Sequence, residues 1–183
     1  EGWRQMVKHL VHGERQGCRL SACDFWYWTR HAKPRGPQRG MLARARADVG
    51  SQFSSDIYER GHARTVCILE CEDLKLPTMF LRRELAVIDW LKQRQGEQDF
   101  DFRDDPAFSD GFVAQGLIER SVRAALSHEV RQLLVEKRSL FATLETNGPY
   151  VLIDCGRRVS PGKCEALFDL AMDLRRFWKS RAM

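Results

Sequence analysis

The sequence lacks the long apolar run that a membrane-spanning helix requires. No stretch of the 183 residues approaches the roughly 18–20 apolar residues needed to cross a bilayer. The first four residues, Glu1 to Arg4, also lack the apolar core of a secretory signal peptide. Because the chain does not begin with methionine, we expect a trimmed chain or a mature fragment. We predict a cytoplasmic protein, associated with a membrane through a segment absent from this chain.

The sequence also lacks the common motifs of catalysis and nucleotide binding. Walker A, GxGxxG, GxSxG and HExxH patterns are all absent. Two weak pairs remain, His9 with His12 as metal ligands and His128 with Glu129 as an acid–base pair. Apolar residues at 7, 10 and 11 favour a short amphipathic helix around the first pair, and Glu129 suits a helix start. We therefore predict no catalytic residue, no cofactor and no metal, and favour a non-enzymatic function.

Six cysteines occur, an even number that is compatible with disulfide bonds. A chain of this length can bury a core without such bonds, and most of the six lie in apolar periodic runs. We favour reduced, buried cysteines, with disulfides or a zinc site of Cys18, Cys23, Cys67 and Cys71 as alternatives. The zinc site is disfavoured because Cys67 and Cys71 would lie about 13 Å apart along one strand face.

The second half of the sequence predicts a β-hairpin flanked by helices. The runs 139–147 and 149–155 are β-prone and meet at Asn147-Gly148, which favours a type I′ hairpin turn. Ser160-Pro161 marks a helix start, and apolar residues then recur at three- and four-residue steps to position 178. Residues 117–137 show the same helical period, with Ser127 as a cap that divides them.

The first half of the sequence is mostly strand-like. Residues 18–29, 65–71 and 78–82 predict strands, whereas 41–51 and 85–94 are compatible with short helices. Strands followed by a helix, a hairpin and a helix indicate an α+β fold. We predict a single domain, residues 1–183, in which a mainly antiparallel sheet is covered by two helices at 117–137 and 161–181.

Positive charge is concentrated in one segment of an otherwise neutral chain. Residues 30–64 contain eight Lys/Arg and three acids, which accounts for the whole formal net charge of +5. Cations can neutralise phosphates, and exposed aromatic rings can stack on bases. The candidate residues for binding an anionic partner are Arg30, Lys33, Arg35, Arg39, Arg44, Arg46, Trp26 and Trp28.

A solvated loop beside buried aromatic residues explains the same pattern. Strand alternation places Trp26 and Trp28 on one face and Phe25 and Tyr27 on the other, so at least one pair should be buried. The acidic run 97–110 is likewise typical of a solvated loop, which can dock the basic segment. It lacks the glycine and the ligand spacing of an EF-hand.

Several stretches resemble a pattern in a family of uncharacterised bacterial proteins. They are Cys23-Asp24-Phe25-Trp26-Tyr27-Trp28-Thr29, Arg64-Thr65-Val66, Leu76-Pro77-Thr78-Met79-Phe80-Leu81-Arg82-Arg83-Glu84 and Gly156-Arg157-Arg158-Val159-Ser160-Pro161. The first three are similar to that family's FDYxYxT, RxTV and LPxFxLRPE motifs. Family members often place a soluble domain behind one or two membrane helices, and the resemblance implies no enzymatic activity. This chain departs from the pattern in its long basic connection and in lacking the proline between Arg83 and Glu84.

Two functions follow as predictions. We favour a non-catalytic interaction or regulatory domain that forms the soluble part of a membrane-anchored bacterial protein. The alternative is nucleic-acid binding through the basic segment 30–64. The expected partner is accordingly a protein, a nucleic acid or an anionic membrane surface.

Overall fold

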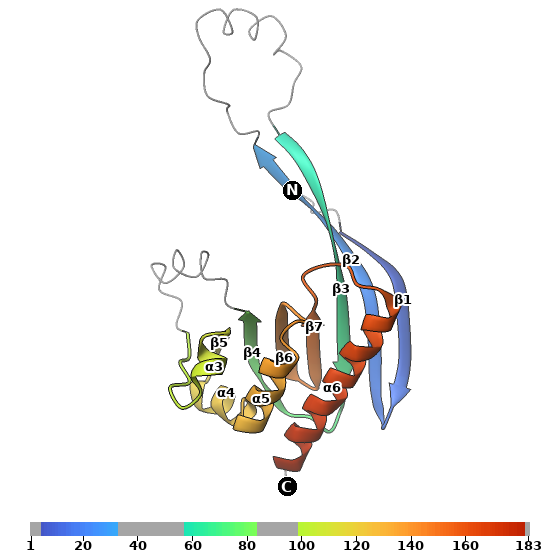
Figure 1. Cartoon of the computed structure of the whole chain (residues 1–183). Coiled ribbons are helices and arrows are strands. Elements are labelled where there is room, and N and C mark those ends of the chain that lie inside the picture. Colours follow the sequence, from blue (N-terminus) through green and yellow to red (C-terminus); the bar gives the residue numbers. More distant parts are fainter. Residues whose placement is uncertain (1–4, 33–56, 84–98, 182–183) are drawn as a thin grey trace, which may run out of the picture.

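The protein folds as an antiparallel sheet with helices on one face (Figure 1). The computed structural model describes residues 5–32, 57–83 and 99–181, so the predicted helices at 41–51 and 85–94 lie outside the described residues. The strands are β1 (Gln5–Arg15), β2 (Cys18–Ala32), β3 (Ile57–Glu70), β4 (Leu76–Arg83), β5 (Phe112–Gly116), β6 (Thr143–Gly148) and β7 (Tyr150–Asp154). Their order in the sheet is β1-β2-β3-β7-β6-β4-β5. The predicted α+β class with an antiparallel sheet is confirmed.

The helical layer differs from the prediction of two covering helices. The helices among the described residues are α3 (Pro106–Ser109), α4 (Glu119–Ala125), α5 (His128–Glu136) and α6 (Pro161–Arg181). The segment 117–137 divides at Ser127 as predicted, because the Ser127 side chain accepts a hydrogen bond from the Val130 N–H at 3.4 Å and caps α5. In Figure 1, α6 crosses the face formed by β1, β2, β3 and β7. None of the described helices has the length and apolar character to span a membrane.

The predicted C-terminal hairpin is present with a shorter first strand. β6 and β7 pair from Thr143 opposite Asp154 to Asn147 opposite Tyr150. The turn differs from the predicted type I′ turn at Asn147-Gly148: Asn147 pairs with Tyr150, so the turn residues are Gly148 and Pro149. Only Gly148 of Asn147 and Gly148 has a positive φ, +58°, a conformation that glycine adopts without strain. Residues 137–140 form turns after α5, which delays the start of β6 to Thr143. This hairpin lies between β3 and β4 in the centre of the sheet.

β1 corrects the prediction of a short amphipathic helix at residues 7–12. These residues belong to an edge strand that pairs with β2 across the Gln16-Gly17 turn. Both turn residues have positive φ, 53° and 75°, which matches the twist of a two-residue hairpin. The register shifts between Lys8 and Val11, so a β-bulge interrupts the alternation of side chains. The apolar residues 7, 10 and 11, whose spacing predicted a helix, span this interrupted part of the strand.

The core lies between the helical layer and the sheet. Alternate residues of the central strands are buried there, including Leu20, Leu69 and Ile153, whereas the intervening Ile68 and Leu152 are only half-buried. α6 contributes the buried residues Leu167, Leu170 and Leu174. β5 was not predicted, and its outer edge is paired with the acidic run, because the Phe100 N–H donates to the Ala114 carbonyl at 2.9 Å.

A disulfide bond corrects the preference for reduced cysteines. Cys18 and Cys71 stand at the start of β2 and just after β3, with their Cα atoms 4.6 Å apart. The antiparallel register of the two strands brings these ends together, and the bond removes two ligands from the zinc site considered above. Cys23, Cys67, Cys155 and Cys164 are free, and Cys67 and Cys155 are buried as expected.

The described part of the acidic run, residues 99–110, is an ordered segment whose acids are mostly exposed, as predicted, but two of its carboxylates are bound by an arginine of α5. The buried guanidinium of Arg131 on α5 donates to Asp104 at 2.6 Å and to Asp105 at 2.9 Å. Asp105 also caps α3 by accepting the Phe108 N–H at 3.2 Å. These carboxylates therefore join α3 to α5.

Candidate ligand-binding cavity

A cavity of about 380 Å³ lies between the first turns of α6 and strands β1 to β3. Its floor is formed by Ala22, Asp24 and Thr65, which are all buried. Its walls include Val159, Cys164 and Phe168, which are half-buried. Its mouth is formed by the exposed residues His9, Val11, Arg158, Pro161 and Glu165. Most ligand cavities are likewise apolar with a few convergent polar groups.

The polar part of the cavity is organised around the Asp24 carboxylate. Asp24 accepts hydrogen bonds from the Thr65 hydroxyl at 2.8 Å and from Arg158 Nε at 2.6 Å, and its Oδ2 lies 3.0 Å from His9 Nδ1. The Thr65 hydroxyl in turn accepts the Val159 N–H at 3.0 Å. The hydrogen bonds of Asp24 to Arg158 and of Thr65 to Val159 fix the segment before α6 against β2 and β3. The polar end of the cavity is therefore preorganised.

The β-bulge in β1 places His9 at this cluster. His9 has a φ of +52°, a conformation that is strained for a residue with a Cβ atom. The bulge turns the His9 ring toward Asp24, whose direct register partner on β1 is Lys8. Bulges often re-aim side chains beside binding sites. The strained backbone conformation therefore occurs at the residue of β1 whose side chain contacts Asp24.

Electrostatics keep Asp24 ionised despite its burial. Burial raises the pKa of Asp24, but hydrogen bonds from Thr65, His9 and Arg158, with the positive charge of Arg158, hold it below its ordinary value. Asp24 accepts from the Arg158 Nε–H rather than from the outer guanidinium nitrogens, one of which lies 3.5 Å from His9 Nδ1. The Arg158 side chain is 52% exposed. An anion at the mouth can therefore reach a guanidinium that is already oriented.

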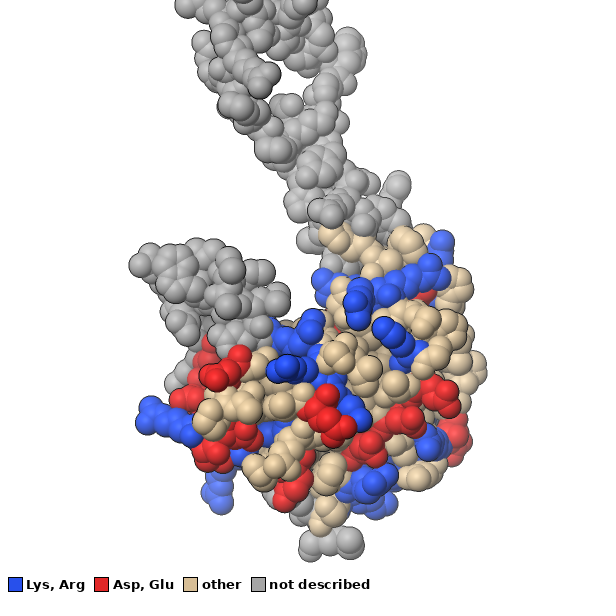
Figure 2. Space-filling view, viewed as in Figure 1, with Lys and Arg blue, Asp and Glu red and all other residues tan. Residues whose placement is uncertain are grey.

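The segment that forms the cavity mouth is basic. Residues 156–165 contain Arg157, Arg158 and Lys163 against the single acid Glu165. Lys and Arg side chains gather near the start of α6 on the helix-covered face (Figure 2). The N-terminus of the 21-residue helix α6 adds partial positive charge at the same place. These charges outnumber the acids Asp24 and Glu165 and favour a negatively charged ligand.

Two free thiols line the cavity, but neither is activated. Burial raises the pKa of Cys23 and of Cys164, and the nearby Asp24 carboxylate raises both further. The buried Cys67 and Cys155 have pKa values raised by burial to about 12. Within the described part of the chain, no hydrogen bond joins His9 to Cys23 or Cys164. The constellation therefore lacks the low-pKa thiol and thiol–imidazole contact of a cysteine nucleophile.

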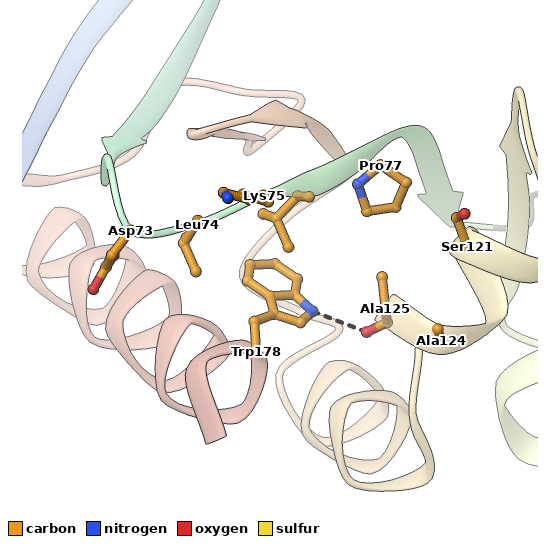
Figure 3. Close-up of a pocket in the computed structure, with 9 residues that line it drawn as sticks. Asp73, Leu74, Lys75, Pro77, Ser121, Ala124, Ala125 and Trp178 are labelled. Carbon is orange, nitrogen blue, oxygen red and sulfur yellow. Dashed lines mark hydrogen bonds between the residues drawn. The ribbon is translucent and has the colours of Figure 1, made fainter. Parts of the chain in front are cut away.

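A larger hollow of about 610 Å³ lies at the opposite end of α6 (Figure 3). The Trp178 Nε1–H in this hollow donates to the Ala125 carbonyl at 2.8 Å. Asp73 at its rim accepts hydrogen bonds from Arg175 at 2.9 Å and Lys179 at 2.8 Å. These contacts hold α4, α6 and the β3–β4 connection together.

Of the predicted anion-binding residues, only Trp26 has a described side chain, and it does not line this cavity. Trp26 is half-buried on β2, with Lys8 Nζ 5.6 Å from its ring centroid. For Arg30 and Trp28 the structure describes only backbone, in β2. The candidates that lie outside the described residues are Lys33, Arg35, Arg39, Arg44 and Arg46. Sequence reasoning passed over Arg158 because it looked for charge runs.

The stretches that resemble the family pattern contribute Asp24, Thr65 and Arg158, which are far apart in the sequence, and Thr65 and Arg158 both bond to Asp24. These stretches also contain Arg64, Arg82, Arg83 and Glu84, so the sequence does not single out the pair of Asp24 and Arg158. No known protein-family model matches the chain, and no curated protein matches its sequence.

Proposed function

We propose that this chain is a single non-catalytic binding domain, and that the cavity beside α6 binds a small amphipathic anion. The observation that carries the proposal is Arg158, half-exposed at the mouth of an apolar cavity and held from behind by the buried Asp24. The carboxylate fixes the guanidinium in place before a ligand arrives, which lowers the entropy cost of binding.

The rest of the cavity supports the same ligand class. Val11, Val159 and Phe168 offer apolar contact for a hydrocarbon or aromatic body. Arg158 and the start of α6 favour a carboxylate, sulfonate or phosphate at the mouth. A binding role suits the thiols as well, since their raised pKa values make Cys23 and Cys164 unreactive neighbours of a ligand.

The proposal is tested by titrating the protein with decanoate by calorimetry and with 8-anilinonaphthalene-1-sulfonate by fluorescence. Arg158→Gln should weaken both probes by about tenfold or more, because a charge-assisted hydrogen bond contributes ~1.5–3 kcal/mol. The adjacent Arg157→Gln is the matched control and should leave both affinities within about twofold. Equal losses in the two arginine variants, or no binding to the wild type, would contradict the proposal.

A second candidate function, nucleic-acid binding, is supported by the shape of the β2–β3 pair. From Trp28 opposite Gly61 to Ala32 opposite Ile57, these strands continue beyond their pairing with β1 and β7 as a two-stranded ribbon (Figure 1). The basic residues of the connection follow the end of this ribbon in the sequence. An electrophoretic shift of duplex or single-stranded DNA that disappears with added salt, and in an Arg35→Gln, Arg39→Gln, Arg44→Gln variant, is the expected result. The absence of a shift at low salt would exclude this function.

A further inference from the structure

The occupant of the cavity can be narrowed further, and this step rests on the proposed binding of a small amphipathic anion. We infer that the anion is the C-terminal residue of an extended polypeptide that pairs as an additional strand with β1. The terminal carboxylate binds Arg158, and the last side chain enters the apolar cavity. The inference follows from the position of the mouth, the free edge of the sheet, and the direction of an added strand.

The cavity opens at the edge of the sheet. Its floor residues Ala22, Asp24 and Thr65 belong to β2 and β3 and are buried, whereas His9 and Val11 on β1 are exposed. A strand added beside β1 would lie about 4.8 Å from it. Its alternate side chains would project on the side of α6, next to Val11, and so into the mouth.

The edge itself has the features of a strand-docking site. Among the described residues no strand pairs with the outer edge of β1, whereas Phe100 pairs with β5 at the opposite edge. Four of the seven exposed large apolar residues lie on β1, namely Met6, Val7, Leu10 and Val11. An exposed apolar edge strand tends to pair with a strand of another chain unless its edge is already covered. Added strands are held by backbone hydrogen bonds and selected by side-chain pockets.

The sheet's antiparallel pattern sets the direction of the added strand. An antiparallel partner of β1 begins beside Arg15 and ends beside His9, so its carboxyl end arrives at the cavity. The regular register of β1 extends from Arg15 to Val11 and is then interrupted by the bulge. The bulge disrupts the ladder at His9 and Leu10, and pairing with β2 resumes only from Lys8 to Gln5. The added strand therefore stops where Arg158 and the basic start of α6 meet a carboxylate of opposite charge.

The experiment uses a fluorescein-labelled hexapeptide of β-prone residues that ends in leucine, as a free acid and as a C-terminal amide. Fluorescence anisotropy should show about tenfold tighter binding of the free acid. Arg158→Gln should reduce the free acid to the affinity of the amide, and Arg157→Gln should not. A version of the free acid methylated at every backbone nitrogen should also bind at least tenfold more weakly, because neither of its edges can donate hydrogen bonds to an edge strand.

A second pair of variants tests the edge. Leu10→Lys on β1 should weaken the free-acid peptide, whereas Leu117→Lys, at an 83% exposed residue before α4, is the matched control and should not. If decanoate binds through Arg158 but the peptide does not displace it, the peptide inference is wrong and the proposed function stands. Equal binding of the methylated and unmodified peptides would likewise overturn strand addition. If neither decanoate nor peptide binds, the proposed function itself fails.

Discussion

The guanidinium carbon of Arg131 lies 4.9 Å from the centroid of the Phe102 ring, and Arg123 lies at the same distance from that ring. Phe102 is buried and belongs to the acidic run, so the two arginines hold this run through its aromatic ring as well as its carboxylates. Arg123 also donates to the Asp101 carbonyl at 2.8 Å. A segment that is strongly charged in sequence is therefore an integral part of the helical layer.

Replacing Arg131 should destabilise the fold substantially. Arg131→Met leaves the nearly buried Asp105 carboxylate without its cation, and removing one partner of a buried pair costs about 3 kcal/mol or more. Arg123→Met removes a cation from the same ring, but its partner Glu119 is half-exposed, so the loss should stay below about 1 kcal/mol. Urea denaturation measures both values. Similar losses of unfolding free energy in the two variants would mean that burial of the Arg131–Asp105 pair contributes little to stability.

Acid should destabilise the wild type more than Asp24→Asn. Although burial raises the pKa of Asp24, its hydrogen bonds and Arg158 bring it below the ordinary value of about 3.9 in an unfolded chain. The stabilisation from ionised Asp24 is therefore complete above that value and is lost as the pH falls through the folded-state pKa. Free energies of unfolding measured at about pH 5 and about pH 2.5 should differ more in the wild type than in the variant. Parallel losses in the two proteins would exclude this role for Asp24.

Breaking the Cys18–Cys71 disulfide should lower stability without altering the native fold. The bond closes a loop with a sequence separation of 53, for which chain entropy predicts a contribution of about 4 kcal/mol. A Cys18→Ser, Cys71→Ser variant should therefore unfold at lower urea concentration, and dithiothreitol should lower the midpoint of the wild type and of Cys23→Ser but not that of the double variant. Cys23→Ser, at a free thiol, is the control. Disulfide bonds persist in oxidising compartments, so the Cys18–Cys71 bond favours an oxidising location. The cytoplasmic location stays a prediction from the sequence.

Gly116 should not tolerate even alanine. A Cβ atom at this position would lie 2.5 Å from Val122 Cγ2 and 2.8 Å from the Thr78 carbonyl oxygen, so β5, α4 and β4 would have to separate. Overpacking of this kind costs about 1–3 kcal/mol. Gly13→Ala on β1 is the control, because no atom lies within 4 Å of its added Cβ. The difference in unfolding free energy between the two variants checks the prediction, and equal stabilities would refute it.

Parts of the fold governed by local chemistry were predictable from the sequence. The hairpin was located by Asn147-Gly148, although its turn residues are Gly148 and Pro149, and Ser160-Pro161 with an apolar stripe specified α6, because turn and cap preferences act over a few residues. The β1 strand was missed because its bulge breaks the alternation that identifies strands. The disulfide was missed because pairing Cys18 with Cys71 requires the register of two distant strands.

The cavity was beyond sequence reasoning for a related reason. Asp24 lies 15, 41 and 134 positions from His9, Thr65 and Arg158 along the chain. No spacing rule joins residues this far apart, and each of them has an ordinary local explanation. The density of positive charge instead predicted a binding segment at residues 30–64. One oriented arginine in a cavity is nevertheless a better-defined ligand group than many arginines in a charged run.

The order of the strands also bears on how the protein is made. β3 and β4 follow each other in sequence but are separated in the sheet by β7 and β6. Until residues 143–154 have left the ribosome, the chain contains two separate pieces of sheet, β1–β2–β3 and β4–β5, with unpaired edges on β3 and β4. Such edges are prone to aggregate. The sheet can be completed only near the end of synthesis, so the nascent chain should need a chaperone more than the finished protein does.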